Sequence, residues 1–154
     1  MSLQTDIIFV AAIKSDTELL KQLAIGDVYN TTIAMPDEDL DNADVPYVIV
    51  SQGDGANDGT TKDDYEGETD TVNITIEVAA RTRAELGMLA DRIRKAVRRY
   101  FRASEEGDEL HDMVPLDYQF SYKPVTYDPL KPCWWMELNY QCDVKNDSTE
   151  EDDE

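Results

Sequence analysis

The residues that could perform chemistry are few, and their spacing fits no catalytic or metal-binding motif. The chain has two cysteines and one histidine, Cys133, Cys142 and His111. A structural zinc site needs about four such ligands, and His111 is the only histidine available as the base of a nucleophilic triad. Among 34 acidic residues, no pair of carboxylates stands out as a general acid and base. We therefore predict a protein that is not an enzyme and has no catalytic residues, metal or cofactor.

An oxygen-rich run from Asp54 to Gly59 resembles a calcium loop only superficially. An EF-hand loop that began at Asp54 would need oxygen ligands at its third and twelfth positions, where this chain has Ala56 and Tyr65. The patterns on both sides of the run predict strands, whereas an EF-hand needs helices. We interpret residues 53–70, which contain seven acidic residues and one basic residue, as a flexible acidic loop or hairpin tip.

The two cysteines are predicted to be reduced thiols. They are nine residues apart in one predicted strand, which places them about 30 Å from each other. A disulfide needs Cα atoms about 5.5 Å apart. Two unpaired cysteines are typical of a cytoplasmic protein.

The charge of the chain excludes some classes of partner. Its 154 residues have a formal net charge of -20, so DNA, RNA and anionic membranes would repel the molecule as a whole. No apolar run approaches the roughly 20 residues of a membrane span. The first residues have no basic region, so we expect no signal peptide.

Patterns of apolar residues predict an alternation of helices and strands. A helix, either bent or divided in two, is expected over 6–23, and a second, with Thr82 and Glu85 as its capping box, is expected to run to about residue 104. A period of two, or a short β-branched run, predicts strands. The predicted strands cover 45–51, 71–80, 118–122 and 133–144, with a possible short strand near residue 28.

Each long strand is expected to be apolar on one face only, which favours an antiparallel sheet covered by helices on one side. The predicted fold class is α+β. It is a two-layer sandwich of a largely antiparallel, four- to five-stranded sheet and two main helices on one face. We expect one domain over 1–146. Residues 147–154, six of which are acidic, are expected to form a disordered tail.

Basic residues concentrate on the second helix. Eight of the 14 lie between residues 81 and 102, where only Glu85 and Asp91 offset them. Either the chain's own acidic loops neutralise this helix, or its basic face binds acids of another copy head to tail. No aromatic residues are interleaved on the basic face as stacking platforms for nucleic acid. The candidate interaction residues are Arg92, Arg94, Lys95, Arg98, Arg99 and Arg102.

The polar face of the last strand is a second candidate surface. Trp135 and Glu137 alternate with apolar residues there. An exposed tryptophan on a polar face is typical of a protein interface, but a loop of the same chain could also cover it.

The order of these elements resembles the tail-completion, or tail-terminator, proteins of tailed bacteriophages and prophages, which belong to the minor tail proteins. The resemblance covers about residues 5–145, and the acidic residues at 53–70 and after 145 depart from it. The segments that carry it are Lys14–Leu20 with Gly26–Tyr29, Val45–Val50, Val72–Thr82 leading into Ala84–Val97, and Trp134–Val144.

The resemblance implies a non-enzymatic structural protein of the virion, assembled in the host cytoplasm. Such a protein would form a ring, commonly a hexamer, that caps the head-proximal end of the tail tube. Its implied partners are copies of itself, the tail tube protein and the head-tail connector proteins, with neither nucleic acid nor membrane among them. An alternative hypothesis is an acidic decoy that mimics DNA and binds a nucleic-acid enzyme.

Overall fold

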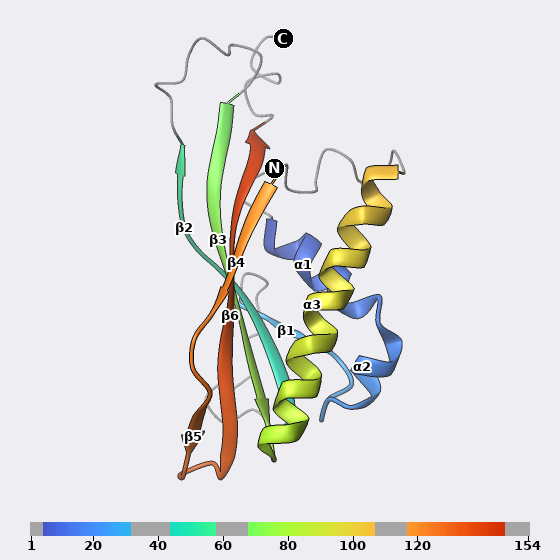
Figure 1. Cartoon of the computed structure of the whole chain (residues 1–154), viewed down its shortest axis with the longest axis vertical. Helices are drawn as coiled ribbons and strands as arrows, with labels where there is room; N and C mark the ends of the chain where they lie inside the picture. The colour runs from blue at the N-terminus through green and yellow to red at the C-terminus, as the bar shows by residue number, and fades with distance from the viewer. Residues whose placement is uncertain (1–4, 32–43, 58–67, 107–116, 147–154) are drawn as a thin grey trace.

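The computed structural model describes residues 5–31, 44–57, 68–106 and 117–146. Three helices lie in this part of the chain, and all three lie on the same side of the sheet (Figure 1). The helices are α1 (Thr5–Lys14), α2 (Thr17–Lys21) and α3 (Arg83–Glu106). The strands are β1 (Tyr29–Asn30), β2 (Tyr47–Asn57), β3 (Glu68–Ala80), β4 (Asp117–Tyr122), β5 (Thr126–Asp128) and β6 (Cys133–Asn146).

The strands form one six-stranded sheet in the order β1-β2-β3-β6-β4, with β5 also paired to β6. All pairs are antiparallel except β1 and β2. The α+β class and the largely antiparallel sheet are therefore confirmed, but the predicted count of four to five strands is too low. Pro124 has no N–H to donate, and it lies where the ladder along β6 is interrupted between β4 and β5.

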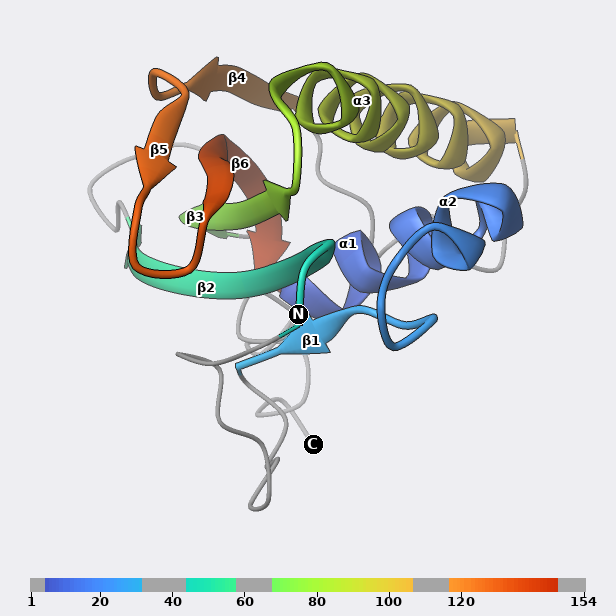
Figure 2. The same ribbon diagram turned by 90° about the horizontal axis from the view of Figure 1, so that it is seen from below.

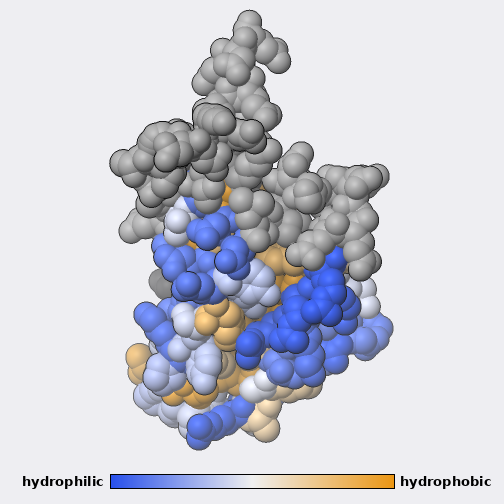
Figure 3. All heavy atoms as spheres, turned by 45° about the horizontal axis from the view of Figure 1, so that its top comes forward, coloured by the Kyte–Doolittle hydropathy of each residue, from blue (hydrophilic) through white to orange (hydrophobic). Residues whose placement is uncertain are grey.

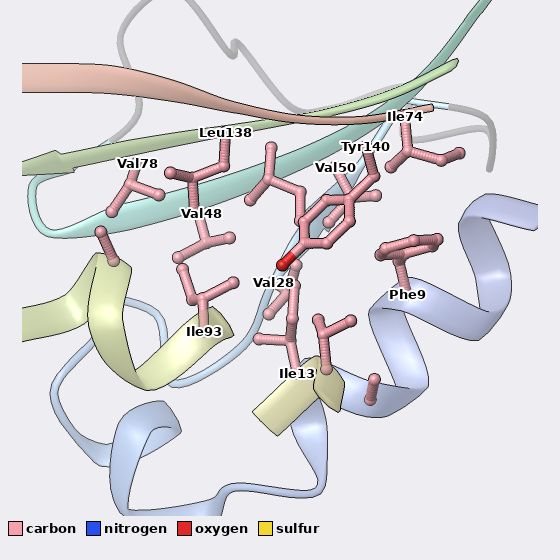
Figure 4. Packing of buried hydrophobic residues seen from close by; sticks show 14 of the residues in the cluster. Phe9, Ile13, Val28, Val48, Val50, Ile74, Val78, Ile93, Leu138 and Tyr140 are labelled. Atoms are coloured by element: carbon pink, nitrogen blue, oxygen red, sulfur yellow. The ribbon is translucent and has the colours of Figure 1, made fainter. Parts of the chain in front are cut away.

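Helices α1 and α3 pack against one face of the sheet, as Figure 2 shows from below. The core between the layers contains Phe9 and Ile13 from α1, Ile93 from α3, and side chains that alternate along the strands (Figure 4). The alternating strand residues of this core include Val72, Ile74, Ile76, Val78 and Ala80 of β3, and Met136, Leu138, Tyr140, Cys142 and Val144 of β6.

The N-terminal helical segment is divided, one of the two forms that the sequence left open. Asp16 is the N-cap of α2, and its side chain accepts a hydrogen bond from the N–H of Leu19. Beyond α2, Gly26 has a φ of 67°, a conformation that favours glycine. The chain then enters β1, which confirms the short strand near residue 28.

The predicted capping box begins α3. The hydroxyl of Thr82 accepts a bond from the N–H of Glu85, and the Glu85 carboxylate accepts one from the N–H of Arg81. Two otherwise unpaired backbone donors are satisfied in this way. The box fixes where α3 begins, and hence the direction in which its arginines project.

Strand β2 corrects the expectation that every long strand is apolar on one face only. Its residues 47–50 are all buried. Tyr47 and Ile49 belong to a second, smaller cluster with Tyr29, Ala79 and Cys133. The opposite faces of β2 therefore contribute to two separate apolar clusters, as in strands that are covered on both sides.

The acidic loop predicted over 53–70 is shorter than expected. Residues 53–57 belong to β2 and residues 68–70 to β3, where Asn57 is paired with Asp70. Backbone pairing with β6 extends β3 to Glu68. Residues 68–70 are polar, so the sequence has no apolar alternation there that could have predicted a strand. Residues 58–67, His111 and the predicted tail 147–154 lie outside the described residues.

Both cysteines are free, as predicted, and the structure shows that both are also buried. Cys142 lies in the main core and Cys133 in the smaller cluster, so their side chains are on opposite faces of β6. Burial raises the pKa of Cys142 to about 12, and burial also raises the pKa of Cys133.

We expect both thiols to resist alkylation until the protein unfolds. A rise in the pKa of Cys142 from 9.0 to about 12 lowers its thiolate fraction at pH 8 by roughly 1,000-fold. Titration with Ellman's reagent should find no fast thiol in native buffer and two in urea. One equivalent that reacts within seconds in native buffer would contradict this burial.

Candidate protein-interaction surface

The basic residues of α3 lie on its outer surface because its apolar positions pack on the sheet. Leu86, Leu89, Ile93 and Val97 are fully buried, and this spacing of three and four leaves the intervening residues exposed. Figure 3 shows hydrophilic side chains gathered over α3 beside an apolar streak toward the sheet. The candidate basic residues therefore share one surface, but their surroundings differ.

Arg92 is engaged within the molecule. Its Nη2 and Nε atoms lie 2.8 Å and 3.0 Å from the two carboxylate oxygens of Asp16. This paired contact joins α3 to the start of α2 and holds the pKa of Asp16 below its usual range. We expect Arg92 to position α2 rather than to contact a partner.

Two other candidates lie on the outer and α2-facing sides of α3. Lys95 forms an ion pair with Asp91, one turn earlier, at 3.0 Å. Arg99 is exposed and lies close enough to Asp16 to help lower the pKa of that carboxyl. Their charges are thus partly offset by nearby acidic residues.

The opposite side of α3 faces aromatic residues of the sheet. The guanidinium carbon of Arg94 lies 4.0 Å from the ring centroid of Phe120 in β4. That of Arg83 lies 6.0 Å from the ring centroid of Trp134 in β6. The sequence showed only that no aromatic residues are interleaved on the basic face of the helix, and it could not show that rings from distant strands lie beside that face.

Arg98 and Arg102 continue the line of Arg94 at successive intervals of four residues. Both are exposed, and neither forms an ion pair within the described part of the chain. Burial raises the pKa of Tyr140, and the positive charges of Arg94 and Arg98 act in the opposite direction. Arg94, Arg98 and Arg102, here called the arginine row, thus lie along the side of α3 that faces β4.

The second candidate surface is partly covered by the chain itself. Trp135 is half-buried and packs against the smaller apolar cluster. Glu137 lies 3.6 Å from Nζ of Lys123. A hollow of about 310 Å³ lies further along the sheet, lined in part by Asn73, Gln119 and Gln141, which are aligned across β3, β6 and β4.

Two features are absent from the part of the chain that the structure describes. No group of three or more His, Cys, Asp or Glu side chains there is placed to hold a metal ion. Within the same residues, no helix has the length and apolar character needed to cross a membrane.

The architecture is a two-layer α+β sandwich with a basic helix surface and a sheet face that no described helix covers. No family model and no curated protein matches the sequence. A chain from a solved structure, described as the virion of a native gene transfer agent (GTA) particle, is similar in fold, with a TM-score of 0.53 and 15% sequence identity. The alignment covers 92% of this chain and 94% of that chain. At this identity, the likeness concerns the fold.

Proposed function

We propose that this protein is a non-enzymatic structural component of a phage-like virion. Within such a particle, it would act as a tail terminator: a ring-shaped oligomer that caps the head-proximal end of the tail tube and joins the tail to the head. Its partners would be copies of itself, the tail tube protein and the head-tail connector proteins.

The observation that carries the proposal is the fold match over almost the whole of both chains to a protein of a GTA virion. A match of this extent concerns the complete domain and not one shared motif. The terminator role, in particular, rests on the resemblance of the element order and of the segments 72–97 and 134–144 to tail-completion proteins. The segregated charge adds support, because a basic surface on an acidic molecule suits head-to-tail contacts that close into a ring.

The DNA-mimic alternative has less support. Such a decoy needs a continuous acidic surface to imitate the phosphate backbone. Along α3, the exposed Arg94, Arg98, Arg99 and Arg102 present the opposite charge. This basic surface disfavours the decoy function.

The proposal predicts a specific assembly defect. Deleting the gene in a strain that produces the particles should leave filled heads and tails that do not join, with tubes of irregular length. Electron microscopy of the lysate would detect both, and expression of the wild-type chain from a plasmid should restore joined particles. Normal particles from the deletion strain would contradict the proposed role.

A further inference from the structure

The arginine row is held in a position suited to carboxylates. Arg94 stacks over Phe120 at 4.0 Å, and a guanidinium that stacks on a ring keeps its N–H groups free at its rim for bidentate contacts. Arg98 and Arg102 follow on the same side of α3 and have no ion pair within the described residues. In contrast, Arg92 and Lys95 are paired with Asp16 and Asp91.

Strand β4 borders this row and is the last strand of the sheet on its side. It pairs with β6 along one edge, and no described strand pairs with its other edge. Its side chains are exposed or half-buried, and Tyr122 is 65% exposed. Unpaired N–H and C=O groups along such an edge can accept an added strand.

The sequence contains a segment whose charge matches this surface. Six of the eight residues from Asp147 to Glu154 are acidic. These residues follow β6 directly in the sequence. Asp143 of β6 pairs with Asp117, the first residue of β4, and β6 continues for three more residues. To lie along the outer edge of β4 in its own chain, the segment would have to reverse direction and pass across β4 itself.

We propose that residues 147–154 of one copy bind along the outer edge of β4 in the next copy, with their carboxylates on Arg94, Arg98 and Arg102. This inference rests on the proposed self-association and names the segment and the surface that carry it. Residues 147–154 and the arginine row are different surfaces of the same chain, so the contact is heterologous and can close into a ring. The same contact explains how copies with a net charge of -20 can overcome their mutual repulsion.

Two full-length variants test the contact. Arg98→Glu with Arg102→Glu reverses the arginine row but keeps Arg94 on Phe120. The second variant replaces each acidic residue of 147–154 by its amide, Asp by Asn and Glu by Gln. Lys21→Glu with Arg81→Glu is the matched control for the first variant, because it makes the same change of charge at exposed sites away from β4. Circular dichroism should show that all three are folded.

Light scattering from micromolar to near-millimolar protein gives the readout. We expect the wild type and the matched control to form the same defined oligomer, with weaker association at higher salt. Each test variant alone should associate more weakly, with a dissociation constant raised at least about 10-fold. Their equimolar mixture should form a one-to-one dimer and stop there, because only one intact acidic segment and one intact arginine row meet.

Three results would overturn the proposal. The first is an amide variant that associates as strongly as the wild type, which would show that the acidic segment is not required. The second is stronger association by that variant, which would show that the segment covers the arginine row of its own chain. The third is a wild type that is monomeric throughout. If the amide variant still restores particles in the deletion strain, this inference fails while the proposed virion role stands.

Discussion

Replacing Phe9 by alanine is expected to lower the free energy of unfolding by about 4 kcal/mol, within the range for a fully buried phenylalanine. Phe9 has no exposed surface and joins three elements. Its ring centroid lies 5.2 Å from that of Phe101 in α3 and 4.9 Å from that of Tyr140 in β6. The alanine variant would leave a cavity between α1, α3 and the sheet that this rigid arrangement cannot fill.

Urea unfolding, followed by the fluorescence of Trp134 and Trp135, would measure this loss. Phe9→Leu should cost less, about 1–2 kcal/mol, because much of the volume is kept. Ile7→Ala is the matched control on the same helix, since Ile7 is 37% exposed and its truncation should cost less than about 1 kcal/mol. A Phe9→Ala variant as stable as Ile7→Ala would show that α1 does not pack as described.

Replacing Asp16 by alanine should destabilise the protein by about 2–3 kcal/mol, because one side chain has two functions. It caps α2 through the N–H of Leu19, and it pairs with Arg92 at 2.8 Å and 3.0 Å. The Asp16 side chain is 9% exposed and that of Arg92 is 36% exposed. The partial exposure of Arg92 lets water hydrate the cation left behind, which limits the cost.

Asp16→Asn separates the two functions, since asparagine caps a helix as well as aspartate does. It should therefore lose only the ionic part, about 1 kcal/mol at pH 7. A double-mutant cycle with Arg92→Ala should give a coupling energy close to that value. Equal stabilities of Asp16→Ala and Asp16→Asn would show that the cap contributes nothing.

The same pair predicts a dependence on pH. The hydrogen bond from Arg92 is the largest cause that holds the pKa of Asp16 below its usual range. The stabilisation by the Asp16–Arg92 pair is therefore complete above the pKa of Asp16 in the unfolded chain, about 3.9. It is lost as the pH falls through the lower pKa of Asp16 in the folded protein. The stability difference between the wild type and Asp16→Asn should shrink as the pH falls below about 4, as measured by urea unfolding.

Local patterns predicted the elements of this fold well, for a physical reason. The alternation in β3 and β6, the spacing of Leu86, Leu89 and Ile93, and the capping box at Thr82 each depend on residues a few positions apart. The prediction was weakest where pairing extends strands into polar sequence, as at residues 53–57 and 68–70. There, hydrogen bonds to a neighbouring strand decide the conformation, and they leave no apolar pattern.

The candidate surface divides in the same way. The sequence by itself determined that basic residues gather on one helix, since composition and helical spacing suffice for that. Only the tertiary structure decided which of these basic residues contact other side chains of the same molecule. Arg92 is paired with Asp16, 76 residues away in the sequence, and Arg94 lies over Phe120 of a strand beyond the end of α3. The packing of α3 against the sheet and α2 determines these contacts, because guanidinium groups bind the carboxylate or ring that folding places within reach.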